Sequence, residues 1–226
     1  MRIKMKFVGL KVVAATALIA LSSFANASLL LVEQYDDFWS TDVNQLISYA
    51  NNNNASSSAY WGEIDFTDDP RGFAGDIPGS NPWPSAANAG ASGTGHALNQ
   101  TFFARITGEF LTTVADNYFF RTFNDDGVFV YIDGELVIND PSLHAERRFE
   151  GSKSLAAGTH SIEVYFFENG GEASLELSVA NSSRIFTHFN DVNSPVSLTA
   201  KIPEPTTLAI FSLGLLGLAA RTRKSK

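Results

Sequence analysis

The chain has 226 residues, no cysteine, 16 basic and 24 acidic residues, and a formal net charge of −8 at pH 7. Four of the basic residues lie before Val12 and four lie after Pro205, whereas every acid lies between Glu33 and Glu204. Removal of both ends would leave 8 basic and 24 acidic residues, a formal charge of −16. Such a surface repels phosphate, which excludes nucleic acid as an expected partner. The lack of cysteine excludes thiol catalysis and cysteine metal sites.

The first 27 residues have the pattern of a secretory signal peptide. Basic residues precede an apolar run from Val12 to Leu21, and Ala25-Asn26-Ala27 supplies the small residues of a cleavage site. We therefore predict cleavage after Ala27, with the body of the protein starting at residue 28.

The segment 201–226 predicts a second export signal. A Pro-Glu-Pro motif at 203–205 precedes an apolar run from Leu208 to Ala220 and a basic end. The apolar run has 13 residues, fewer than the roughly 20 that a stable membrane-spanning helix needs. A frayed C-terminal helix or a marginal membrane anchor with its basic end inside is the alternative from composition alone.

The order of these C-terminal features resembles the PEP-CTERM sorting signal. That resemblance implies transient anchoring in the inner membrane through Leu208 to Ala220, and then removal of the tail by a membrane protease of the exosortase type. The protein would reach the cell surface, the outer membrane or the extracellular polymer of a Gram-negative bacterium, with exosortase and the secretion machinery as partners during sorting.

One short helix followed by many short strands is predicted for the body. Apolar residues recur at helical spacing from Ser40 to Ala50, and Asp42 with Gln45 resembles a capping box. Alternating β-branched and aromatic residues then predict strands at Phe102 to Phe110, Tyr118 to Phe123, Val128 to Ile132, Leu136 to Ile138, Glu146 to Phe149, His160 to Phe167, Ala173 to Val179 and Ile185 to Phe189. This pattern favours one all-β domain over 28–200, an antiparallel sandwich or barrel with a short N-terminal helix and long loops.

Two segments of the body predict loops. The polar run from Asn51 to Ser58 is typical of a flexible loop. Residues 65–95 are rich in Pro, Gly, Ser and Asn and predict a long irregular segment that packs as a binding loop or lid. Its apolar residues Phe73, Ile77 and Trp83 indicate that it packs against the domain.

The best candidate for chemistry is an acid pair between two alternating apolar runs. Asp125 and Asp126 are adjacent there, and Gly127 follows them. Neighbouring carboxylates repel each other, and a hard cation such as calcium, with six to eight oxygen ligands, would hold both ionised. Asp-Gly is also a common turn signal, and the local pattern alone favours a turn over a metal site. The second such pair, Asp133-Gly134, predicts a two-residue hairpin turn.

The sequence around the acid pair reads YFFRTFNDDGVFVYIDGELVIND, and a later segment reads SLAAGTHSIEVYFFENGGEASLELSV. This order resembles the protective-antigen lectin-like domain found in anthrax toxin, yeast flocculins and many bacterial glycosidases. The resemblance covers roughly residues 29–180 and is strongest after Phe102. It implies a lectin-like fold and a calcium site in which a cis peptide joins the two aspartates. The metal ligands that it implies are Asp125, Asp126 and Asn169, and the ligand-binding positions are Asn124, Gly127, Gly170 and Gly171.

The same resemblance implies a binding module, with two vicinal sugar hydroxyls completing the calcium coordination. Where this family accompanies glycosidases it is the accessory binder, and no nucleophile elbow or phosphate loop stands out in the sequence. We therefore expect a non-enzymatic, exported, calcium-dependent carbohydrate-binding module that binds a polysaccharide or glycan in adhesion or polysaccharide retention. The alternative is a structural surface or biofilm matrix protein with the same fold and no sugar binding.

Overall fold

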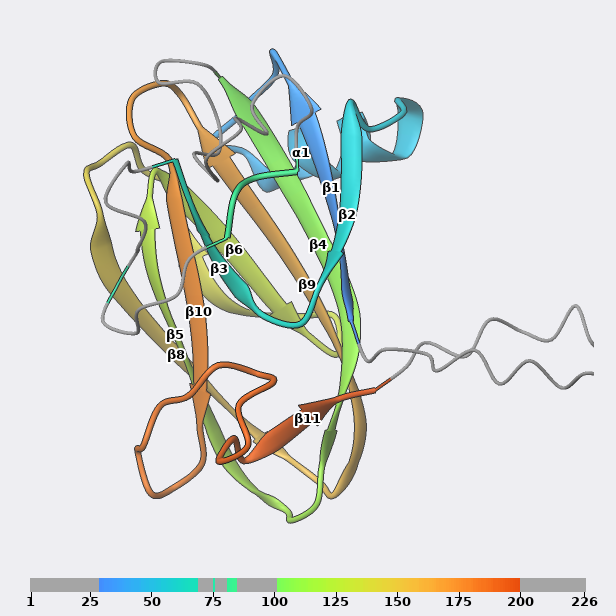
Figure 1. Ribbon diagram of the computed structural model, residues 1–226, viewed down its shortest axis with the longest axis vertical. Coiled ribbons are helices and arrows are strands. Elements are labelled where there is room, and N and C mark those ends of the chain that lie inside the picture. Colours follow the sequence, from blue (N-terminus) through green and yellow to red (C-terminus); the bar gives the residue numbers. More distant parts are fainter. Residues whose placement is uncertain (1–28, 69–74, 76–80, 85–100, 200–226) are drawn as a thin grey trace, which may run out of the picture.

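The computed structural model describes residues 29–68, 75, 81–84 and 101–199, which fold as two antiparallel β-sheets packed face to face (Figure 1). The larger sheet contains, in spatial order, β2 (Ser57–Trp61), β1 (Leu30–Asp36), β4 (Phe102–Thr112), β9 (Gly158–Glu168), β6 (Gly127–Ile132) and β7 (Glu135–Asp140), and β11 (Val196–Leu198) also pairs with β4. The smaller sheet contains β3 (Ile64–Thr67), β10 (Ser174–Ala180), β5 (Asp116–Asp125) and β8 (Arg147–Leu155). The predicted all-β sandwich is confirmed.

The core lies between the two sheets and follows the alternation of the strands. Val164 and Phe166 of the larger sheet and Leu175 and Leu177 of the smaller one are completely buried there. Trp83 enters the same core and donates its Nε1–H to the carbonyl oxygen of Ala173 at 3.2 Å. The predicted packing of the long irregular segment is therefore confirmed at this residue. Its other two apolar positions, 73 and 77, lie outside the described residues.

The predicted helix is present as α1 (Val43–Asn52). Asp42 is its N-cap, and the Asp42 carboxylate accepts the backbone N–H of Asn44 at 2.9 Å. In a capping box the Gln45 side chain would accept the backbone N–H of Asp42 directly, and here it does so only through Ser40. Ser40 Oγ accepts the N–H of Asp42 at 3.0 Å and donates to Gln45 Oε1 at 3.1 Å. The serine therefore lies between the two groups that a capping box would join directly.

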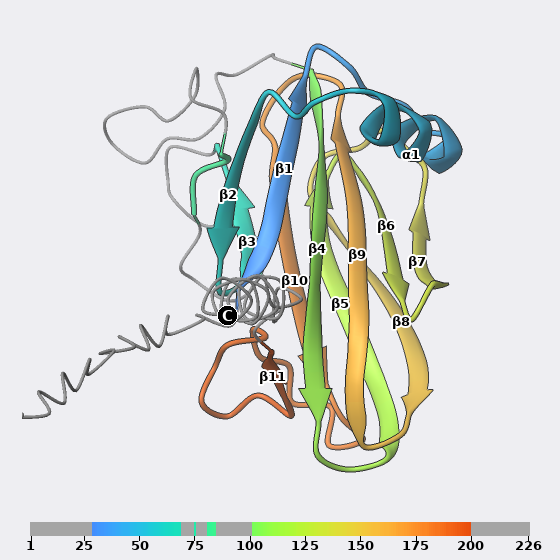
Figure 2. The same cartoon turned by 90° about the vertical axis from the view of Figure 1, so that its right-hand side faces the viewer.

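Helix α1 covers one end of the outer face of the larger sheet, on the side away from the smaller sheet (Figures 1 and 2). Leu46 and Ala50 are the buried residues of the helix, and they pack in a cluster with Tyr35, Phe103 and Phe167. Both faces of the larger sheet are therefore apolar at this end, where β4 begins and β9 ends.

Several boundaries differ from the sequence-based prediction. The strands β1, β2, β3 and β11 were not predicted, since β3 and β11 have only four and three residues and β1 and β2 contain adjacent polar residues that interrupt the alternation. The polar run 51–58 is not one loop, because α1 continues to Asn52 and β2 begins at Ser57. Strand β8 starts at Arg147 and continues to Leu155, beyond the predicted end, through a Gly-Ser-Lys-Ser sequence that pairs with β5.

The predicted strand from Ile185 to Phe189 is wrong. Only one isolated bridge forms there, between Thr187 and Val179. Phe189 is completely buried in the core, whereas Ile185 is 70% exposed, so the apolar residues anchor an irregular segment at one end only. An apolar run of this length does not distinguish a strand from a loop that inserts one aromatic ring.

The expected hairpin turn between β6 and β7 is confirmed. Asp133 and Gly134 both have positive φ, at 52° and 75°, as a type I′ turn requires. Among the described residues, none of the helices is long and apolar enough to span a membrane. The two expected export segments, 1–27 and 201–226, lie outside the described residues.

Candidate metal centre

The acid pair lies where the chain crosses from the smaller sheet to the larger one. Asp125 is the last residue of β5 and Gly127 is the first residue of β6, so only Asp126 lies between the two strands. The predicted loop is thus a sheet-to-sheet crossing and not a hairpin. The peptide bond between Asp125 and Asp126 is cis, as the family resemblance implies.

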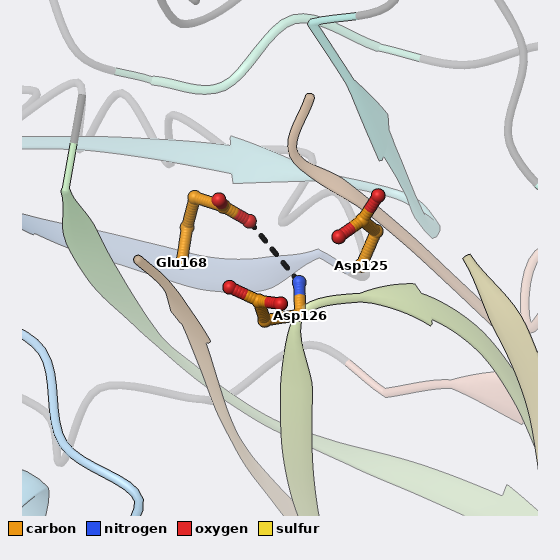
Figure 3. Close-up of side chains that lie close together, drawn as sticks. All are labelled: Asp125, Asp126 and Glu168. Atoms are coloured by element: carbon orange, nitrogen blue, oxygen red, sulfur yellow. Dashed lines mark hydrogen bonds between the residues drawn. The ribbon is translucent and has the colours of Figure 1, made fainter. Parts of the chain in front are cut away.

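A third acid, Glu168, joins the pair. It is the last residue of β9, which pairs with β6 in the larger sheet. Each of the three carboxylates offers one oxygen, and these oxygens lie within 4.8 Å of one another. Figure 3 shows the three side chains converging on a common space from the ends of their strands. Asp126 is 6% exposed and Glu168 is 1% exposed, while Asp125 is half-buried.

Backbone N–H groups hold the Asp126 and Glu168 carboxylates in place. Asp126 Oδ1 accepts the N–H of His144 at 2.8 Å, and Asp126 Oδ2 accepts the N–H of Asn169 at 3.0 Å. Glu168 Oε2 accepts the N–H of Asp126 at 3.1 Å, and Glu168 Oε1 accepts the N–H of Gly170 at 2.6 Å. The two carboxylates therefore fix the loop between β7 and β8 and the loop between β9 and β10 against the crossing. Each oxygen keeps a second lone pair for another partner.

Asn124 supports the crossing from inside the core. It is completely buried, and its Nδ2 donates to the carbonyl oxygen of Asp126 at 2.6 Å and to Asp140 Oδ2 at 2.8 Å. Asp140 is itself buried and also contacts His144 Nε2 at 2.6 Å and Ser142 Oγ at 2.6 Å. The arrangement gives Asn124 a supporting position, and its predicted role in ligand binding stays a prediction.

The three glycines predicted at the site differ in their surroundings. A Cβ atom on Gly127 would lie 2.2 Å from the Phe167 ring and 2.7 Å from the carbonyl oxygen of Asp140, so close packing excludes any side chain there. Gly170 and Gly171 have φ of 124° and 127°, which residues with a side chain rarely adopt. They shape the loop after Glu168, and ligand contacts by any of the three remain predictions.

The electrostatics of the three acids are unfavourable without added positive charge. Burial, followed by repulsion from Asp126 and Asp125, raises the pKa of Glu168 to about 8. Burial, followed by repulsion from Asp126, raises the pKa of Asp125 to about 6. Nearby Asp68 is also buried and accepts the N–H of Ala173 at 2.6 Å, and burial raises its pKa to about 7. The cluster therefore favours either protons or a bound cation.

The donor set fits a hard cation. All three side chains offer carboxylate oxygens, the ligands that calcium and magnesium prefer. Calcium–oxygen distances of 2.3–2.6 Å place oxygens on opposite sides of a calcium ion about 4.6–5.2 Å apart, and those on opposite sides of magnesium only about 4.0–4.2 Å apart. Three oxygens within 4.8 Å of one another are close enough to bind one such ion together.

The structure brings together Asp125 and Asp126 as predicted and adds Glu168 to them, while the role of Asn169 as a metal ligand stays a prediction. Asn169 reaches the centre through its backbone N–H, and the residue is exposed. Glu168 was missed, although its position in β9 carries a signal. Side chains two residues apart in a strand point to the same face, so Glu168 lies on the same face of β9 as Val164 and Phe166. A strand that buries those two side chains therefore also turns Glu168 towards the interior.

The comparisons with known proteins agree with this fold. The model of the PA14 domain matches residues 52–185, and that of the PEP-CTERM protein-sorting motif matches residues 201–224. No curated protein matches the chain. A PA14 sugar-binding domain from an RTX adhesin superposes with a TM-score of 0.52 at 20% identity, covering 71% of this chain and 94% of the adhesin domain.

Two further solved structures have the same fold. The PA14 domain of the MpAFP antifreeze protein gives a TM-score of 0.53 at 15% identity, covering 79% of this chain and 94% of that domain. A subtype-switched epithelial adhesin A domain from Candida glabrata, solved in complex with β-lactose, gives a TM-score of 0.51 at 11% identity, covering 77% and 90%. The PA14 match spans more than half of the sequence. The chain therefore belongs to the PA14 domain family and carries a PEP-CTERM motif.

Proposed function

We propose that this protein is an exported, calcium-dependent carbohydrate-binding module that acts at the cell surface or in the extracellular polymer. The observation that carries the proposal is the convergence of the half-buried Asp125 with the buried Asp126 and Glu168 at one end of the sandwich. Membership of the PA14 family supports a glycan as the ligand, and two of the structures with the same fold are a sugar-binding domain and a complex with β-lactose.

In the proposed mechanism the chain supplies a rigid, negatively charged cradle. Asp126 and Glu168 already accept four backbone N–H bonds, so ion binding would need little rearrangement of either carboxylate. When bound, calcium would supply open coordination positions that two vicinal sugar hydroxyls can fill. Asn169 and the carbonyl groups of Gly170 and Gly171 are proposed as further oxygen ligands.

The loop between β7 and β8 is proposed to contact the sugar beside the ion. Leu143 in this loop is 46% exposed, and the next residue, His144, donates its N–H to Asp126. An exposed apolar side chain at such a position can cover the C–H face of a sugar ring, a part that the Gly-Gly-Glu sequence after Asn169 does not supply. The proposed function is not enzymatic, and neither family match is to an enzyme family.

A glycan array with the exported protein tests this function. Binding should appear in millimolar calcium and disappear in chelator, and Asp126→Asn should abolish it. Asp133→Asn, the same change in the hairpin turn, should leave it unchanged and serves as the control. Binding by the parent that persists in chelator and in Asp126→Asn would place the sugar elsewhere. An array without any bound glycan would favour a structural matrix role.

The PEP-CTERM match supports removal of the tail after export. Mass spectrometry of the surface and culture fractions should find peptides of the domain but none beyond about residue 206. Recovery of intact 221–226 peptides from the exported protein would contradict processing and would favour a membrane-anchored form.

A further inference from the structure

Helix α1 has an exposed face without any charged residue, although the chain is strongly acidic. Residues 43–62, which include the whole helix, contain no Asp, Glu, Lys, Arg or His, whereas the chain as a whole has 24 acids. Surface helices ordinarily carry charged residues on the side opposite their apolar stripe. Here that side carries amides and a hydroxyl, from Asn44, Gln45, Ser48 and Asn52.

A groove of about 410 Å³ runs along this face. Its polar lining comes from the same uncharged residues and from Asn53, and its apolar lining comes from Phe38 and Tyr49. The two aromatic rings stack, with centroids 4.0 Å apart and an angle of 14° between their planes. The groove is shallow and largely open to solvent, so a ligand would lie along it with part of its surface exposed.

The amides of the groove are already oriented by the helix. Asn52 Nδ2 donates to the carbonyl oxygen of Ser48 at 2.7 Å, and Asn53 Nδ2 donates to the carbonyl oxygen of Tyr49 at 2.9 Å. Gln45 is held through Oε1 by Ser40 Oγ at 3.1 Å. An amide has two donors and two acceptor lone pairs, so each of these groups keeps hydrogen-bonding capacity after its internal bond. Groups fixed in advance lose little conformational entropy when a ligand binds.

The geometry points to a second, metal-independent binding site in this groove, for a neutral polysaccharide chain. Oriented amides match sugar hydroxyls, and the partly exposed aromatic pair adds apolar surface beside them. The lining offers no charge to an ionic ligand, and an acidic chain repels anionic ones. The choice of a glycan as the ligand class rests on the proposed function, but the site itself does not depend on calcium.

Helix α1 lies at the end of the molecule where β9 ends and β6 begins, the strands that carry Glu168 and follow Asp126 (Figure 2). One row of register partners runs across the larger sheet from Tyr35 through Phe103 and Phe167 to Gly127. Tyr35 and Phe103 lie under Tyr49, and Gly127 is next to Asp126. Three strand spacings correspond to about 14 Å. The groove lies on the outer face of the larger sheet, whereas Glu168 turns towards the interior, so the two sites are spatially distinct.

Affinity gel electrophoresis of the exported protein in chelator tests the site. The gels contain dextran, mannan, galactan, xylan or mixed-linkage β-glucan, with alginate as the anionic comparison. We expect at least one neutral polysaccharide to retard the protein and alginate to have no effect. Ser48→Trp fills the groove and should weaken the interaction at least about tenfold, while Asn51→Trp, on the same exposed helix but outside the groove, should leave it unchanged.

A second variant guards against indirect effects of the large side chain. Gln45→Glu keeps the oxygen that accepts Ser40 Oγ but adds a charge and removes two donors, so it should also weaken retention while unfolding at the parent's temperature. If no neutral polysaccharide retards the parent in chelator, or if Ser48→Trp is retarded equally, the inference is overturned. Sedimentation that changes from dimer to monomer in Ser48→Trp, without retention of the parent, would also overturn it and make the face a self-association surface.

The two proposals fail in different ways. If the groove binds and the metal centre does not, retention is equal in calcium, in chelator and in Asp126→Asn. If the metal centre binds and the groove does not, retention requires calcium and is unaffected by Ser48→Trp.

Discussion

Asp126-Gly127 and Asp133-Gly134 are the same dipeptide at two ends of strand β6, and they have different surroundings. Asp133 is 38% exposed, and its carboxylate bonds His160 Nδ1 at 2.7 Å and the N–H of Ser161 at 2.9 Å. Burial raises its pKa, but these hydrogen bonds and the charge of His160 outweigh burial and lower it. Asp126 lies instead among buried acids whose pKa values are raised.

The Asp-Gly dipeptide alone therefore does not determine whether its carboxylate belongs to a turn or to a candidate metal centre. At Asp133 a histidine and a backbone N–H from one neighbouring strand satisfy the carboxylate, and the turn needs no ion. At Asp126 the N–H donors come from two distant loops, and two further acids, Asp125 and Glu168, converge on it. Residues brought from elsewhere in the chain therefore separate a turn from a candidate metal centre.

The largest expected effect is stabilisation of the folded protein by calcium, which should depend on Asp126 and not on Asp133. Calcium that binds only the folded protein should raise its unfolding free energy by about 2.7 kcal/mol at a hundredfold excess over Kd. Asp126→Asn should remove this increment, because the amide loses the charge that binds a hard cation. Asp133→Asn should retain it. Thermal unfolding in calcium and in chelator measures the calcium stabilisation of the parent and of both variants. A parent protein with the same stability in calcium and in chelator would contradict the metal centre.

The glycines that follow the two aspartates should also differ in their effect on stability, with the larger loss at Gly127. Gly127→Ala should lower the unfolding free energy by about 1–3 kcal/mol or more, because the added Cβ would collide with Phe167 and a backbone carbonyl. Gly134→Ala has open space around its Cβ and should cost only about 1–2 kcal/mol, from its positive φ. Chemical denaturation in chelator measures both. A larger loss at Gly134 than at Gly127 would contradict the packing argument.

Much of the fold could be predicted from the sequence because strands that alternate strongly, such as β4 and β9, carry their own signal. Strand β2 could not, since its Ser-Ser-Ala sequence is stable as a strand only through pairing with β1. In the site, the adjacent aspartates are visible locally. Glu168 is not, because its role depends on the pairing of β9 with β6, which one sequence does not specify.

The next prediction compares Glu168 with Asn169 as the third metal ligand. Glu168→Gln should weaken calcium binding about tenfold or more, roughly 1.4 kcal/mol, because it removes one of three converging charges. Asn169→Ala should have a smaller effect if its contribution is mainly the backbone N–H that it donates to Asp126. Calorimetric titration of both variants decides between them. A larger loss of calcium affinity in Asn169→Ala than in Glu168→Gln would favour Asn169 as the third metal ligand.

The last expected effect is a dependence of the unfolding free energy on pH, whose direction follows from two raised pKa values. The pKa of Asp125 rises from 3.8 to about 6 on folding and that of Glu168 from 4.5 to about 8. Between about pH 4 and pH 8 the folded, calcium-free protein therefore holds more protons than the unfolded chain, so its unfolding free energy falls as pH rises. Calcium replaces those protons, and the stabilisation that it adds should grow with pH over the same window.

Unfolding in chelator at pH 5, 6.5 and 8 measures the first trend, and repetition in calcium measures the second. Titration in two buffers with different ionisation enthalpies should also detect protons released when calcium binds. Glu168→Gln should reduce the slope between pH 6.5 and 8, because the amide cannot titrate. A calcium-free protein that becomes more stable from pH 5 to pH 8 would mean that these carboxylates are stabilised as anions by the protein itself, and the electrostatic argument for a cation would fail.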